Sequence, residues 1–226
     1  MDSTTQSIAT LLASLTEANR RQRLEHPRTF KIGAEKIAFT KALLAFFYKQ
    51  EVENRGMAYR PMQEKPFIEI LQFLTSRASK PSLLLYGTTG TGKTTMATAI
   101  RMTIATIAKN ELQTNQLTIA SVKATELGNI LKNDAQRFEA LKNKTVLFLD
   151  DLGFFGEEKV NDYGTTRYPV GELLEHRYDR QLATICTSNL DWSELGERYG
   201  ERLHSRMAEM FKVLTMTGQD YRTAIK

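Results

Sequence analysis

Two kinds of hydrophobic pattern alternate along the chain. Short, mostly apolar runs occupy residues 83–85, 117–122, 146–149, 182–187 and 211–216. Between them, apolar side chains recur every three or four residues, and one such stretch predicts a helix from Lys93 to about Asn110. Apolar runs of this kind are typical of parallel strands covered on both faces. The alternation predicts an α/β fold, with a parallel five-stranded sheet flanked by helices and ligands at the carboxyl ends of its strands.

Residues 1–60 differ from the rest because they contain no glycine-rich turn and have helical spacing throughout. A second apolar stripe there comprises Ile37, Phe39, Leu43, Leu44, Phe46 and Phe47. Pro61 disfavours helical geometry at Arg60, so we expect a boundary there. The sequence thus predicts a small helical N-terminal module at 1–60 and the α/β domain at 61–226. The stripe fits either packing on the neighbouring domain or binding of a partner, and the sequence leaves both open.

Composition narrows the classes of function only slightly. The net charge of +5 and the pI near 9.2 permit nucleic-acid binding without requiring it. The single cysteine, Cys186, excludes an internal disulfide and a zinc site built from cysteines. It favours a reduced, cytoplasmic setting. The sequence has no run of eighteen apolar residues and no signal-peptide pattern, so we expect neither a membrane-spanning nor an exported protein.

The turn after the first apolar run has the spacing G-x-x-x-x-G-K-T of a phosphate-binding loop, the P-loop. Its N–H groups and the start of the next helix would face the phosphates of a nucleoside triphosphate. Lys93 would reach the β- and γ-phosphates, and the Thr94 hydroxyl would bind Mg²⁺. The predicted ligands are therefore ATP and Mg²⁺, and the predicted nucleotide-binding residues are Gly87, Thr88, Thr89, Gly90, Thr91, Gly92, Lys93, Thr94 and Thr95.

The apolar run at 146–149 ends in two carboxylates, about sixty residues after the P-loop, as in a Walker B element. Asp150 would hold the Mg²⁺ and neutralise charge between the phosphates. Asp151 would orient or deprotonate the attacking water. An aspartate at this second position is one methylene shorter than the glutamate of vigorous ATPases, so slow or stimulated ATP hydrolysis is expected.

Three further polar residues follow the later runs. Asn189 comes two residues after the run at 182–187, where a side chain can lie beside the γ-phosphate and position water. Arg202 and Arg206 are four residues apart, so they share one helix face. They could complete the nucleotide site of a neighbouring subunit. The alternative is ordinary helix pairing of these arginines with Glu201 or Glu209.

Together these motifs resemble the DnaC/IstB family of AAA+ ATPases. The resemblance rests on the P-loop, Asp150-Asp151-Leu152-Gly153, Thr187-Ser188-Asn189-Leu190 and the element Gly200-Glu201-Arg202 with Arg206 four residues on. It implies an AAA+ core at 61–226, Asn189 as sensor 1, and Arg202 or Arg206 as an arginine finger acting in trans in an ATP-dependent homo-oligomer. The chain ends soon after the last predicted strand, so we expect no C-terminal helical lid.

The resemblance also implies partners. In the DnaC branch the N-terminal module binds the replicative helicase while the core binds single-stranded DNA, which gives a helicase loader in DNA replication. In the IstB branch the protein assembles on DNA and activates a transposase. Cationic and aromatic side chains suit single-stranded DNA, and the candidates here are Lys123, Lys132, Phe154, Lys159 and Tyr163.

Two other classes of function stay open on the sequence. One is a P-loop kinase for a small molecule, with Arg167 in the loop 164–167 closing over the phosphates. The other is a scaffold that uses ATP only to assemble. A helicase loader is the preferred hypothesis, and a transposition ATPase of the same fold is the nearest alternative.

Overall fold

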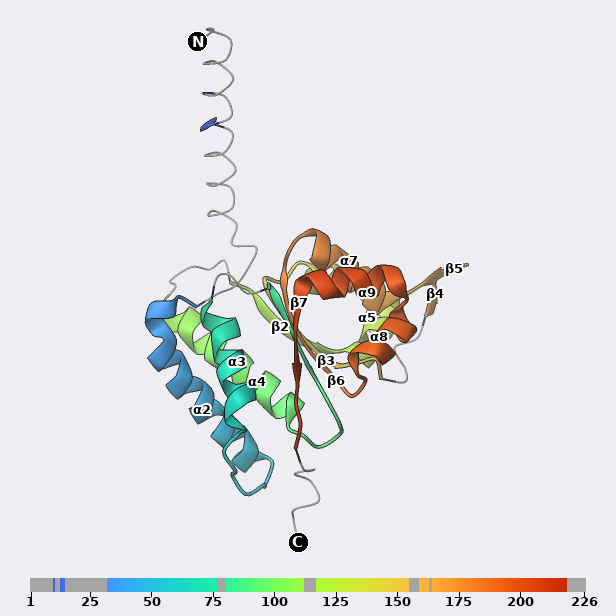
Figure 1. The fold of residues 1–226 in the computed structure, drawn as a ribbon. Coiled ribbons are helices and arrows are strands. Elements are labelled where there is room, and N and C mark those ends of the chain that lie inside the picture. The colour runs from blue at the N-terminus through green and yellow to red at the C-terminus, as the bar shows by residue number, and fades with distance from the viewer. Residues whose placement is uncertain are drawn as a thin grey trace.

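Five parallel strands form the centre of the molecule (Figure 1). The computed structural model describes residues 32–76, 80–111, 117–154, 159–162 and 164–218, together with residues 10, 13 and 14. The strands are β1 (Ser82–Tyr86), β2 (Ile119–Lys123), β3 (Val146–Leu152), β6 (Ala183–Ser188) and β7 (Phe211–Thr215), in the order β2-β3-β6-β1-β7. The prediction of a parallel five-stranded sheet is confirmed.

Helices cover both faces of this sheet (Figure 1). One face carries α2 (Ile37–Asn54), α3 (Glu64–Thr75) and α4 (Lys93–Glu111), which enclose one hydrophobic core with the sheet. The other face carries α5 (Leu127–Asn133), α6 (Ala135–Lys142), α7 (Pro169–Asp179), α8 (Trp192–Tyr199) and α9 (Glu201–Met210), around a second core. Short 3-10 helices, η1 (Ala34–Lys36) and η2 (Ala124–Glu126), precede α2 and α5. Among the described helices, none is long and apolar enough to span a bilayer.

Local signals explain where these elements begin and end. The three leucines at 83–85 are fully buried in β1, as expected for a strand covered on both faces. The helices α5 and α6 are separated at Asp134, whose side chain accepts a hydrogen bond from the backbone N–H of Arg137 and so caps α6. The carboxylate of Asp191 and the side chain of Glu194 form a capping box that begins α8.

A short antiparallel hairpin stands apart from the main sheet (Figure 1). It consists of β4 (Val160–Asp162) and β5 (Thr165–Arg167). The interpretation of 164–167 as a loop is therefore wrong for 165–167. Apart from Val160 the residues of these strands are polar, so the alternating apolar pattern that predicts strands is missing from them.

Helix α2 shares a core with the α/β domain. Its buried residues Leu44, Tyr48 and Val52 belong to the same hydrophobic cluster as the P-loop strand and α4. The part of the predicted N-terminal module at 37–54 thus packs against α4, one of the helices that cover the sheet. The module has another set of apolar residues at helical spacing, Ile8, Leu11, Leu12 and Leu15, and all four lie outside the described residues. A division of the chain at residue 60 stays a prediction.

Candidate nucleotide-binding site

The P-loop connects the carboxyl end of β1 to the first turn of α4. Gly87 adopts φ +146°, and a Cβ atom there would lie 2.2 Å from the backbone oxygen of Met216, just after β7. That contact leaves no room for a side chain. The Met216 N–H also donates to the Tyr86 oxygen at 2.7 Å. The end of β7 therefore fixes the start of the loop, a requirement that the G-x-x-x-x-G-K-T spacing does not reveal.

The side chain of Lys93 lies folded over the loop. Its Nζ donates to the backbone oxygens of Gly87 and Thr88 at 2.7 and 2.8 Å, and the residue is 6% exposed. The Thr91 hydroxyl donates to the same Thr88 oxygen at 2.9 Å. These bonds hold the ammonium group beside the curl of the loop, where the phosphates of a nucleotide would lie.

The side chain of Asp150 on β3 forms hydrogen bonds to α4 and β6. Its Oδ1 accepts hydrogen bonds from the hydroxyl of Thr94 on α4, at 3.1 Å, and from the hydroxyl of Thr187 on β6. Carboxylate and hydroxyl oxygens are the hard ligands that Mg²⁺ prefers. Thr94 and Asp150, predicted as metal ligands, are thus adjacent and suit this ion. Thr187 was not among the predicted site residues, although it precedes the Ser188-Asn189 pair.

Asp151 has a left-handed backbone, with φ +58°. The register of β3 against β6 shifts between Leu149 and Leu152, so Asp151 sits at an irregularity of the strand. Its N–H donates to the Thr187 hydroxyl at 3.0 Å, which holds this conformation. Aspartate tolerates the left-handed region better than most residues. The result is that Asp151 and the nearby Asn189 both line the cavity in front of the P-loop.

The cavity has a volume of about 620 Å³, within the usual range for small-molecule sites. One end is the P-loop with Asp151 and Asn189, and we call it the phosphate end. The opposite wall comes from α2 and the segment after it, and we call it the α2 end. Its residues are Tyr48, Val52, Arg55, Met57, Ala58 and Arg60. Sequence reasoning missed all six, because no local pattern in 48–60 shows which element these residues face.

Arg202 and Arg206 lie elsewhere. Neither is among the described residues that line the cavity. Both form ion pairs with Glu175 on α7, with N–O distances of 3.5 and 3.0 Å. The alternative of pairing with Glu201 or Glu209 is therefore not the one adopted. The predicted grouping of Lys93, Asp150, Asp151 and Asn189 is found in one site, but the arginine pair is not part of it.

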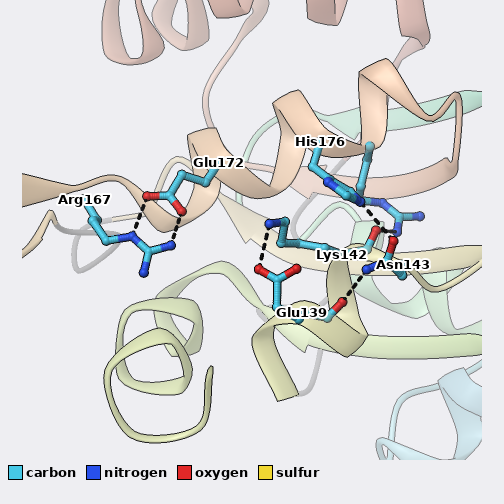
Figure 2. Close-up of polar contacts among 7 residues, drawn as sticks. Glu139, Lys142, Asn143, Arg167, Glu172 and His176 are labelled. Carbon is cyan, nitrogen blue, oxygen red and sulfur yellow. Dashed lines mark hydrogen bonds and ion pairs between the residues drawn. The ribbon is translucent and has the colours of Figure 1, made fainter. Parts of the chain in front are cut away.

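Arg167 is the residue that supported the hypothesis of a P-loop kinase. It belongs to the hairpin of β4 and β5 and not to a lid. Its Nε lies 2.9 Å from Oε1 of Glu172, and its Nη2 lies 2.5 Å from Oε2. Figure 2 shows this two-pronged contact between the end of β5 and the first turns of α7. The guanidinium thus anchors the hairpin, and the kinase hypothesis loses its one supporting residue.

The candidate DNA contacts come from several elements of the described structure. Lys123 ends β2, Lys132 lies on α5 and Lys159 precedes β4, each with an exposed side chain. Phe154 is 53% exposed and lines the cavity, and its oxygen accepts from Arg198. Tyr163 lies outside the described residues. DNA binding by these residues stays a prediction.

Comparison with known proteins agrees with this geometry. The profile of the ATPase family associated with various cellular activities (AAA) matches residues 83–213. The replicative helicase loader DnaI of Bacillus subtilis is 30% identical over 148 residues, which cover 62% of this chain but only 44% of the loader. A protein of insertion sequence IS232 from Bacillus thuringiensis, named for ATP binding, is 23% identical over 79% of this chain and 70% of its own length.

A solved structure of DnaI superposes with a TM-score of 0.54 at 24% identity, covering 72% of this chain and 88% of that one. At that identity the likeness shows the fold alone. The family profile, in contrast, covers more than half of the sequence and includes both the P-loop strand and the arginine helix. The protein therefore belongs to the AAA family of ATPases, as its resemblance to the DnaC/IstB group predicts.

Proposed function

We propose that the protein is an ATP-dependent switch that hydrolyses ATP slowly and acts as a helicase loader in DNA replication. The observation that carries the ATPase part is the convergence of Thr94, Asp150 and Thr187 beside the P-loop, with Asp151 facing the same cavity. A bare phosphate-binding turn would need no such carboxylates. Their placement supports hydrolysis in addition to binding.

Each residue of the phosphate end has a separate task in this proposal. The loop N–H groups and Lys93 bind the phosphates and offset their charge. Thr94 and Asp150 hold Mg²⁺, which when bound supplies positive charge between the β- and γ-phosphates. Asp151 accepts the proton of the attacking water or orients that water, and Asn189 helps to hold it. The α2 end supplies an apolar wall of Tyr48, Val52 and Met57, suited to the nucleobase.

The arginine pair is proposed to act on the nucleotide of a neighbouring copy. Arg202 and Arg206 lie outside the cavity of their own subunit, and the side chain of Arg202 is 78% exposed. A guanidinium that approaches the phosphates only in an assembly would link hydrolysis to the formation of that assembly. This arrangement accounts for a slow ATPase whose turnover depends on a homo-oligomer.

The partner is proposed to be a replicative helicase bound with single-stranded DNA, since the relative of highest identity above is a helicase loader. The alternative is a transposition ATPase, which the insertion-sequence relative favours. Both alternatives need the same nucleotide site. They differ in the protein that the ATP-bound form retains.

The test is retention on the immobilised full chain of the purified replicative helicase or the transposase of its host, with and without ATP. Retention of the helicase that requires ATP, and is lost in Lys93→Ala, supports the loader. Retention of the transposase instead supports the alternative. If neither is retained while ATP is hydrolysed, the partner assignment is wrong and the ATPase assignment stands.

A further inference from the structure

Arg202 and Arg206 meet at one carboxylate oxygen, Oε1 of Glu175 on α7. The Nε of Arg202 lies 3.5 Å from it, and the Nη1 of Arg206 lies 3.0 Å from it. Two like charges four residues apart on a helix repel each other. The shared carboxylate offsets that repulsion and brings the two guanidinium groups together. The pair uses few of its N–H donors on this contact, since each guanidinium carries five.

The helix that carries Glu175 is firmly held. Arg177, two residues further along and on a different face of the helix, is fully buried, and burial lowers its pKa to about 9, so it stays protonated at neutral pH. It donates to oxygen atoms of Leu141, Lys142, Lys144, Ala183 and Thr184. His176 adds a contact of 3.0 Å to Asn143, shown in Figure 2. Glu175 therefore projects from a fixed support.

The two arginines are held to different degrees. Arg206 is 25% exposed and also lies over the ring of Tyr178, 5.3 Å from its centroid. The hydroxyl of Tyr178 in turn donates to Glu209, which fixes the ring. The side chain of Arg202 is 78% exposed, and its ion pair with Glu175 is longer than that of Arg206. Glu175 thus fixes one guanidinium and restrains the other at the surface.

We propose that Glu175 is a positioning residue that aims the arginine pair at the nucleotide bound by a neighbouring copy of this chain. The proposal rests on the proposed function, in which the pair acts in trans. Glu175 touches no nucleotide itself. It limits the orientations of two long side chains before subunits meet, so less conformational freedom is lost when they reach the phosphates.

The direct test is the turnover of Glu175→Gln at protein concentrations where the wild-type chain assembles with ATP. Glutamine keeps the shape of the side chain and removes its charge, and thermal melting checks that the variant folds. We expect turnover to fall about fivefold, the effect of losing a favourable exposed ion pair. Turnover equal to that of the wild-type chain would overturn the proposal.

Mixed assemblies separate positioning in trans from damage within one subunit. Asp151→Asn subunits bring an intact Glu175 and arginine pair but lack their own turnover. Added in excess to Glu175→Gln subunits, they should restore the turnover of the Glu175→Gln sites. The double variant Asp151→Asn/Glu175→Gln should not. Failure of the first mixture to restore turnover would place the defect inside the variant subunit and overturn the proposal.

Glu172→Gln is the matched control, because Glu172 lies three residues away on α7 and pairs with Arg167 of the hairpin. It should not lower the ability of a subunit to stimulate its neighbour. An equal loss in Glu172→Gln would assign the effect to α7 in general and contradict a specific role for Glu175. Absence of ATP turnover in the wild-type chain would instead refute the proposed function, and this inference with it.

Discussion

The two ends of the cavity are built on different principles. At the phosphate end, backbone geometry determines the shape of the site, because Gly87 has no space for a Cβ atom and Asp151 occupies the left-handed region. Hydrogen bonds from Thr94 and Thr187 then fix the Asp150 carboxylate. At the α2 end, the packing of side chains determines the shape of the site, and Tyr48 and Val52 are buried there.

This difference determines how each end tolerates change. The phosphate end depends on atoms that occupy single positions, so one substitution removes a contact that no neighbour can replace. The α2 end depends on apolar area, which several side chains share. Changes at the first end should therefore affect turnover, and changes at the second end should mainly affect nucleotide affinity.

The largest effect is expected from Lys93→Ala or Asp150→Ala. Each removes a charge that offsets the developing charge on the phosphates, so turnover should fall by about 100-fold or more. Steady-state release of phosphate measures it, and binding of a fluorescent ATP analogue shows whether Asp150→Ala still takes up nucleotide. Undiminished turnover in both variants would contradict the account of the phosphate end.

The next effect, at Asp151, is at the lower limit of that range for turnover and has a second part in stability. Asp151→Asn keeps a residue that accepts φ +58°, so it should lose turnover by about 100-fold without losing stability. Asp151→Ala should lose the same turnover and also about 1 kcal/mol of unfolding free energy, because alanine is strained in this conformation. Chemical denaturation beside a turnover assay separates the two. Equal stability of both variants would show that the backbone there is not strained.

The smallest effect is expected at the α2 end. Arg60 lines the cavity and has an exposed side chain, so Arg60→Ala should weaken ATP binding by about threefold, with turnover at saturating ATP unchanged. Lys41→Ala, which removes an exposed charge elsewhere on the same side of the fold, is the control for net charge. A larger loss of turnover than of affinity in Arg60→Ala would mean that the α2 end takes part in catalysis.

The phosphate end was predictable from the sequence because its chemistry is local. The P-loop and the Asp150-Asp151 pair are short segments at the carboxyl ends of strands, and apolar runs identify those strands. Their meeting follows from the topology of any parallel sheet. The sheet and the positions of Lys93 and Thr94 at the start of α4 could thus be inferred without coordinates, while the roles of these two residues stay predictions.

The α2 end, Thr187 and Glu175 could not be inferred in the same way. Tyr48 and Val52 have ordinary helical spacing, and their position depends on the packing of α2 against α4. Glu175 sits in a helix with several charged residues, and nothing in the sequence marks it as the partner of a helix 27 to 31 residues later. Long-range packing of this kind leaves no local pattern.

The central claim is that a nucleotide site is completed by the arginine pair of a neighbouring copy. The most direct measurement mixes equal amounts of the double variant Arg202→Ala/Arg206→Ala with Asp151→Asn, each inactive alone. Random assembly in which each copy stimulates one neighbour predicts recovery of about a quarter of wild-type turnover. A mixture that stays as inactive as its two components would contradict the claim.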